Sequence, residues 1–155
     1  MKILDTNLWV FGMLGTNSRA VELLDEIERG ETVSAISAYM AQEALNAVDR
    51  TPGLTTTEQD ELKTLFFTRL SRMTGLIEAP SSRDFEAGLL DQRRSTVQTQ
   101  LLARVTDIQP KDIPILVLAF KHRDRSPTVF TNDADFAAFA PDEYDLSELS
   151  FEHVA

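Results

Sequence analysis

The sequence contains no cysteine, which excludes a disulfide framework, a thiolate nucleophile and a zinc–thiolate site. It also has no apolar stretch near the roughly 18 residues that a membrane span needs. The N-terminus leads directly into a strand pattern, without the charged and apolar regions of a signal peptide, so we expect no targeting segment. Without these features, we expect a soluble, cytoplasmic protein. Lysine is also scarce, with only four lysines among the 15 basic residues.

Acidic residues are abundant instead. Twenty-five Asp and Glu against 15 Lys and Arg give a formal net charge of −10. This excess is typical either of a halophilic protein adapted to high intracellular salt, as in haloarchaea, or of an ordinary acidic cytosolic protein, and both interpretations stay open. A protein this acidic repels nucleic acid at moderate salt. At about 1 M salt the Debye length falls to about 3 Å, so net charge then no longer excludes a polyanionic substrate.

Apolar periodicity and breaker residues predict alternating strands and helices in one domain over residues 1–155. We predict strands over 2–5, 32–37, 76–79 and 128–131, with an edge strand within 144–151. We predict helices over 18–30, 38–49, 57–73, 97–108 and 134–140, and another that begins at residue 81 or 82. Residues 113–120 are apolar all round, which leaves helix and strand both open. This order predicts a three-layer α/β/α fold with a mainly parallel sheet.

Two aspartates near opposite ends of the chain each follow a short apolar run. Asp5 ends the run over residues 2–4, and Asp133 comes two residues after the run over 128–131. A run that stops abruptly at small polar residues is typical of a buried parallel strand at its carboxyl end. Open α/β sheets bind their ligands at that edge. Two carboxylates brought there together suggest a metal site.

Three further acids, Glu43, Asp112 and Asp135, have positions of interest, although each acid has a structural interpretation when it is taken alone. Asp5 fits a turn. Asp112 fits a helix N-cap or a first-turn acid, and Asp133 or Asp135 fits the N-cap of the next helix. Glu43 lies roughly opposite the apolar stripe of its helix, as a solvated glutamate does. Their joint appearance in this order favours a shared function.

Four segments contain these acids: Leu4-Asp5-Thr6-Asn7, an Ala-rich helix with Glu43, Lys111-Asp112-Ile113-Pro114, and Thr131-Asn132-Asp133-Ala134-Asp135-Phe136. Together they resemble the PIN-domain family, and within it the VapC-like toxins of type II toxin–antitoxin systems, which are compact ribonucleases. The resemblance spans residues 1 to about 140 and implies a parallel sheet of about five strands, with a helix over 113–120. It implies that Asp5, Glu43, Asp112 and Asp133 are the metal-binding, catalytic acids and that Asp135 is an auxiliary ligand.

The resemblance also implies the cofactor and the reaction. Thr6, Asn7, Thr131 and Asn132 would support the acids. Carboxylates completed by water suit Mg²⁺ or Mn²⁺, and we expect one or two ions. One ion would activate a water, and a second, about 4 Å away, would stabilise the leaving oxygen of an in-line displacement. The expected activity is hydrolysis of RNA phosphodiester bonds by an endoribonuclease.

The charged segments and the resemblance together suggest the partners. Candidates for contact with RNA phosphates are Arg93, Arg94, Arg123 and Arg125, although a solvated helix end also explains Arg123 and Arg125. We expect a small antitoxin that covers the acidic cleft, a homodimer, and no membrane partner. Two alternatives stay open. One is an RNA-processing PIN nuclease outside a toxin system, and the other is a non-catalytic PIN-like binding module in which the acids only cap helices.

Overall fold

The computed structural model describes residues 1–80 and 97–155, in which strands alternate with helices. The strands are β1 (Lys2–Leu4), β2 (Ser34–Ala35), β3 (Leu76–Glu78), β4 (Thr128–Thr131) and β5 (Ser150–His153). The α-helices are α1 (Thr6–Leu14), α2 (Ser18–Glu28), α3 (Ala38–Arg50), α4 (Thr56–Arg72), α7 (Val97–Thr106), α8 (Ile113–Lys121) and α9 (Ala134–Ala137). Two 3₁₀ turns, η1 (Arg123–Arg125) and η2 (Pro141–Tyr144), complete the order. No helix in these ranges is long and apolar enough to cross a membrane.

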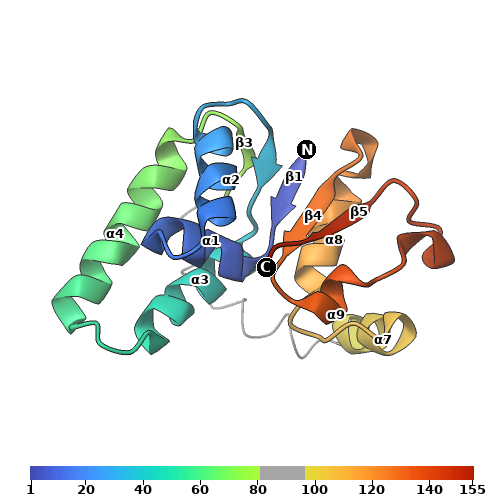
Figure 1. The fold of residues 1–155 in the computed structure, drawn as a ribbon. Helices are drawn as coiled ribbons and strands as arrows, with labels where there is room; N and C mark the ends of the chain where they lie inside the picture. Colours follow the sequence, from blue (N-terminus) through green and yellow to red (C-terminus); the bar gives the residue numbers. More distant parts are fainter. Residues whose placement is uncertain (81–96) are drawn as a thin grey trace.

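All strand pairs in the described ranges are parallel, which confirms the predicted α/β class. β4 pairs with β1 on one side and with β5 on the other, and β2 pairs separately with β3. The two ladders meet where the Lys2 amide donates to the Val33 carbonyl at 2.9 Å. The strands therefore follow one another as β3, β2, β1, β4 and β5 across the molecule (Figure 1). Because they are parallel, their carboxyl ends lie along one edge.

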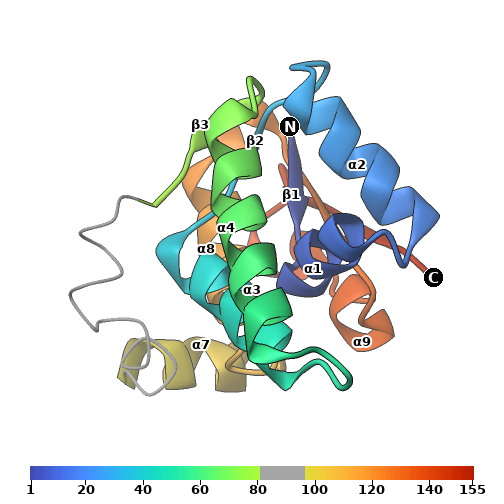
Figure 2. The same cartoon turned by 90° about the vertical axis from the view of Figure 1, so that its left-hand side faces the viewer.

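Helices cover the strands from both sides. α2 and α9 lie on one side, and α7 and α8 lie on the other (Figure 2). The central strands read as continuous apolar runs because both of their faces are covered. Ile3, Leu4 and Val129 are completely buried, together with Trp9 of α1 and Ile113 of α8. The three-layer arrangement predicted from the sequence is therefore the one observed.

Helix α1 was not predicted, and it determines where Asp5 lies. Asp5 ends no strand; it is the residue before α1, with φ −57° and ψ 150°, and the chain turns directly from β1 into the helix there. Leu8, Trp9 and Val10 are consecutive and all buried, so the helix has no polar face that a periodicity could reveal. It ends at Gly15, whose φ of 70° is a left-handed conformation that glycine adopts without strain.

Several predicted boundaries need correction. The helix predicted over 18–30 ends at Glu28, and although Ser18 is a suitable N-cap residue, the N-cap of α2 is Asn17, whose side chain accepts from the Ala20 amide at 3.0 Å. The strand predicted over 32–37 has only two paired residues, and the helix predicted over 134–140 ends at Ala137. The open segment 113–120 is helical, and an edge strand forms as β5, which begins at Ser150, near the end of the predicted range 144–151, and extends beyond it. The helix predicted from residue 81 or 82 lies outside the described residues.

Candidate functional site

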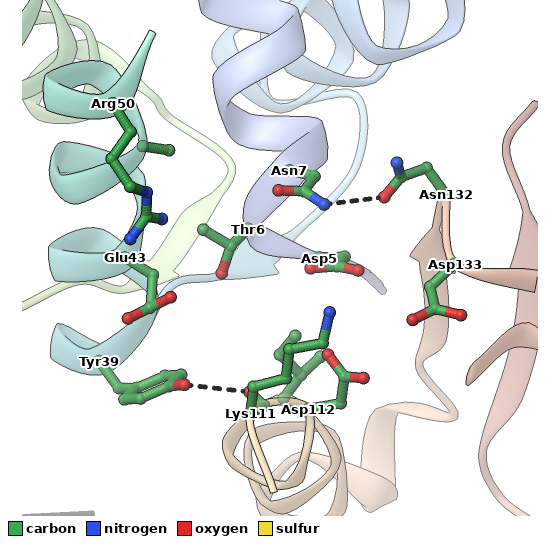
Figure 3. A pocket seen from close by; sticks show the side chains of 12 residues that line it. Asp5, Thr6, Asn7, Tyr39, Glu43, Arg50, Lys111, Asp112, Asn132 and Asp133 are labelled. Atoms are coloured by element: carbon green, nitrogen blue, oxygen red, sulfur yellow. Dashed lines mark hydrogen bonds between the residues drawn. The ribbon is translucent and has the colours of Figure 1, made fainter. Parts of the chain in front are cut away.

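A cavity of about 480 Å³ opens at the carboxyl ends of β1 and β4 and is lined by acids. The four carboxylates predicted to act together, those of Asp5, Glu43, Asp112 and Asp133, all line it. Glu43 stands on one side and Asp133 on the other, with Asp5 and Asp112 between them (Figure 3). The acids come from four segments of the chain, and the parallel strands and their flanking helices bring them to one place.

Asp5 is a buried acid whose carboxylate is held by hydrogen bonds from the ends of two strands. Its residue is 5% exposed, and its Oδ2 accepts a hydrogen bond from the Thr131 hydroxyl at 2.6 Å. Burial raises the pKa of the Asp5 carboxyl above its ordinary value. The Thr131 hydroxyl, the Asn7 amide, the positive charge of Lys111 and the Thr6 amide each offset part of this rise in the pKa. The carboxylate is thus held in a place where ionisation is costly.

Thr131 links the two strand ends. While its hydroxyl donates to Asp5, the same oxygen accepts from the Asp133 amide at 3.0 Å. Thr131 is completely buried at the end of β4, so its rotamer is fixed by packing as well as by these two bonds. One hydroxyl therefore sets the position of the Asp5 carboxylate relative to the Asp133 main chain.

Asp133 caps helix α9 and lines the cavity at the same time. Its Oδ1 accepts from the amides of Asp135 and Phe136 at 2.9 and 3.3 Å. The N-cap interpretation is therefore correct for Asp133 and not for Asp135. The cap engages Oδ1, while the carboxylate borders the cavity (Figure 3). The structural and the functional interpretations of this residue are compatible.

The side chains of Asn7 and Asn132 close one border of the cavity. Asn7 Nδ2 donates to Asn132 Oδ1 at 3.2 Å, which ties the start of α1 to the end of β4 (Figure 3). The Asn132 carbonyl lies 3.3 Å from Nε2 of His153, at the end of β5. Thr6 also lines the cavity. The supporting residues named from the sequence thus lie beside the acids. Their contacts connect the carboxyl ends of β1, β4 and β5.

Glu43 and Asp112 differ from their simplest structural interpretations. Glu43 is half-buried and borders the cavity, because the side of α3 that is opposite its apolar stripe faces this cavity. Asp112 precedes α8, but its side chain makes no capping hydrogen bond, and the residue is only 5% exposed. Asp112 is therefore not the capping residue that its position before the helix suggested.

Other candidates are not brought to the cavity. Asp135 is exposed and does not line it. Arg123 and Arg125 lie in η1, just before β4 begins, and so at the opposite ends of the strands from the acids. Arg123 stacks on Phe120 at 4.3 Å and donates to the Phe120 carbonyl. Arg93 and Arg94 lie outside the described residues.

Three polar lining residues were missed: Tyr39, Arg50 and Lys111. The Tyr39 hydroxyl donates to the Lys111 carbonyl at 3.2 Å (Figure 3). Arg50 follows Glu43 by seven residues, a spacing of two helical turns that places both on one face of α3, and this spacing was visible in the sequence. Lys111 directly precedes Asp112, but nothing in the sequence tells which way its side chain points.

The donor set suits a hard divalent cation. Carboxylate oxygens with completing waters are what Mg²⁺ and Mn²⁺ prefer. Across residues 1–80 and 97–155, however, no three acidic or histidine side chains are gathered closely enough to hold a metal ion as they stand. A cation that keeps several waters tolerates such spacing, because water molecules bridge it to the more distant carboxylates. The residues thus fit a hydrated cation better than a fully protein-ligated one.

In comparisons with known proteins, no protein-family model and no curated protein sequence matches this chain.

Proposed function

We propose that this protein is a divalent-metal-dependent endoribonuclease that hydrolyses RNA phosphodiester bonds. The observation that supports this most directly is the convergence of Asp5, Glu43, Asp112 and Asp133 on one cavity. Four carboxylates that border one cavity give it a negative potential, which favours a bound cation. The position of the cavity, outside the carboxyl ends of parallel strands, is also where α/β sheets bind ligands.

The acids would hold one or two Mg²⁺ or Mn²⁺ ions, with Asp135 outside the set. When bound, these ions would lower the pKa of a water and stabilise charge on the scissile phosphate. Thr131 orients Asp5 through its 2.6 Å hydrogen bond. Asn7 and Asn132 hold the two strand ends together. No histidine, serine or cysteine of the described chain lines the cavity, so we propose water as the nucleophile.

The biological setting that we propose rests on the resemblance of the motifs to VapC-like toxins. The protein would act in the cytoplasm as the toxin of a type II toxin–antitoxin pair, and it would form a homodimer. A small antitoxin would inhibit it by covering the acidic cavity or by placing a cation there. Purification with its antitoxin would then suppress RNA cleavage, and removal of the antitoxin would restore it.

A non-catalytic binding module is the second candidate. The observation that favours it is the cap on α9, because Asp133 has a structural task whether or not a metal binds. In such a module the acids would serve helix ends and turns only. Asp112, which makes no capping hydrogen bond, argues for the nuclease over this alternative.

Substitution of Asp5 tests the proposal. Asp5→Asn keeps the shape of the side chain and removes its charge, so Mg²⁺-dependent cleavage of single-stranded RNA should fall by at least about 100-fold, the scale of losing one preorganised electrostatic contact. Asp135→Asn is the matched control, since it makes the same change outside the cavity, and it should cleave like the parent. Rates are measured with labelled RNA, in Mg²⁺ and in EDTA.

Two results would contradict the nuclease. One is cleavage by Asp5→Asn at the parent rate. The other is RNA binding without metal-dependent cleavage by the parent protein, which would favour the binding module instead.

A further inference from the structure

Half of the basic side chains that the structure describes are paired with neighbouring acids. Within residues 1–80 and 97–155, Lys2, Arg19, Arg29, Lys63, Arg69 and Lys121 form ion pairs with carboxylates. The other six of the twelve basic residues in these ranges make no such ion pair with the described residues. Arg50 and Lys111 make no ion pair with the described residues, and both line the acidic cavity.

The two cations enter the cavity from different elements. Arg50 is the last residue of α3, and its guanidinium points to the side of the cavity where Glu43 stands (Figure 3). The Lys111 ammonium points toward Asp5 (Figure 3), and its positive charge acts on that carboxylate. The Lys111 main chain is fixed by the hydroxyl of Tyr39, a residue only 2% exposed. The ammonium therefore extends from a rigid base.

Helix stability alone does not explain this arrangement. A cation in the last turn of a helix favours the helix dipole, and Arg50 has that benefit on any side of α3. A lysine beside a buried aspartate partly compensates its charge. Neither effect requires that both cations face the same cavity and make no ion pair there. A bound polyanion explains it, because cations beside the four carboxylates weaken their repulsion of phosphate.

We propose that Arg50 and Lys111 form a basic rim that binds backbone phosphates of single-stranded RNA beside the acids. This inference rests on the proposed function and names where its substrate lies. The strand would be held on the Glu43 side of the cavity, opposite Asp133 and Asn132. Contacts to phosphate position a strand but do not read its bases, so the rim orients the RNA without selecting its sequence.

RNA binding in EDTA tests the rim separately from cleavage. The full-length protein is titrated with a short fluorescent oligouridylate at several KCl concentrations. Arg50→Gln and Lys111→Gln should each weaken binding about tenfold, the scale of one lost charge-assisted hydrogen bond. Each should also make the negative slope of the logarithm of the association constant against log[salt] shallower by about 0.7, the value for one phosphate contact on a single strand. The double variant should make the slope shallower by about twice that amount.

Arg72→Gln is the matched control. Arg72 ends α4 at an exposed position, makes no ion pair with the described residues and does not line the cavity, so its loss changes the net charge equally. It should leave the affinity and the slope near those of the parent. Lys111→Arg, which keeps the charge, should restore much of the affinity lost in Lys111→Gln.

The outcomes separate the rim from the nuclease. If the rim variants bind like Arg72→Gln while the parent cleaves RNA with Mg²⁺, the rim is wrong and the nuclease stands. If the rim variants lose affinity and salt slope but the parent never cleaves, the rim stands and the nuclease is wrong. If the parent does not bind the oligouridylate at any salt concentration, the rim is overturned.

Discussion

The two strand ends that meet at the cavity hold their aspartates in different ways. Asp5, after β1, is buried, and its pKa is raised by that burial. Asp133, after β4, is half-buried, and its carboxylate caps α9 through two amides. Removal of charge at Asp5 relieves a burial cost, whereas removal of the Asp133 carboxylate loses a cap. Similar motifs at a sheet edge thus have different effects on stability, and only the structure distinguishes them.

Thr131 connects the two strand ends, and its substitution should give the largest change in the free energy of unfolding. Thr131→Val keeps the volume but removes the hydroxyl that donates to Asp5 and accepts from the Asp133 amide. Because the buried Asp5 carboxylate then loses its donor, the free energy of unfolding should fall by about 2 kcal/mol. Urea unfolding of the metal-free protein measures this change. Thr131→Ser, which keeps the hydroxyl, should recover most of the loss; equal stability of the valine and parent proteins would refute the shared-hydroxyl account.

The Asp133 end gives a smaller effect that separates its two tasks. Asp133→Ala removes the cap of α9 and should lower the free energy of unfolding by about 1 kcal/mol. Asp133→Asn retains a side-chain oxygen that can cap, so it should unfold like the parent while it loses metal-dependent cleavage. Thermal unfolding and the RNA cleavage assay measure the two quantities. Full activity of Asp133→Asn would assign this residue to the cap alone.

The same physical contrast explains what could be predicted from sequence. The short apolar runs before Asp5 and Asp133 predict buried parallel strands, and β1 and β4 form nearly where expected. Strand ends are local features, since an apolar run and the polar residues that end it are adjacent. Sequence periodicity alone left residues 113–120 undecided, and the resemblance to a known family gave the correct helix.

Features that depend on tertiary surroundings could not be predicted in this way. Helix α1 has apolar residues around its circumference, so it shows no amphipathic pattern. Taken alone, the sequence shows only that Glu43 is opposite an apolar stripe, which is typical of a solvated face, and the family resemblance was needed to group it with the other acids. In the structure that face borders a cavity shared with distant segments. The direction of the Lys111 side chain depends on the same distant neighbours and has no local signal.

The raised pKa of Asp5 also predicts how the stability of the protein depends on pH. Because burial raises the pKa of Asp5, the folded protein binds this proton more tightly than the unfolded chain does. The Asp5 contribution therefore lowers the free energy of unfolding as pH rises from the ordinary pKa through the raised one, and the full cost persists above it. Asp5→Asn should remove this dependence and leave the metal-free protein more stable at neutral pH than the parent.

Lys111→Met should act in the opposite direction and more weakly. The Lys111 charge lowers the pKa of Asp5, so its loss should raise that pKa further and extend the range over which stability falls with rising pH. Carbon-detected NMR of the Asp5 carboxyl in EDTA measures the pKa, and urea unfolding at several pH values measures the stability. Arg50→Met is the control, since Arg50 also lines the cavity but is not among the groups that shift Asp5. An unchanged Asp5 titration in Lys111→Met would mean that the ammonium does not act on this carboxylate in solution.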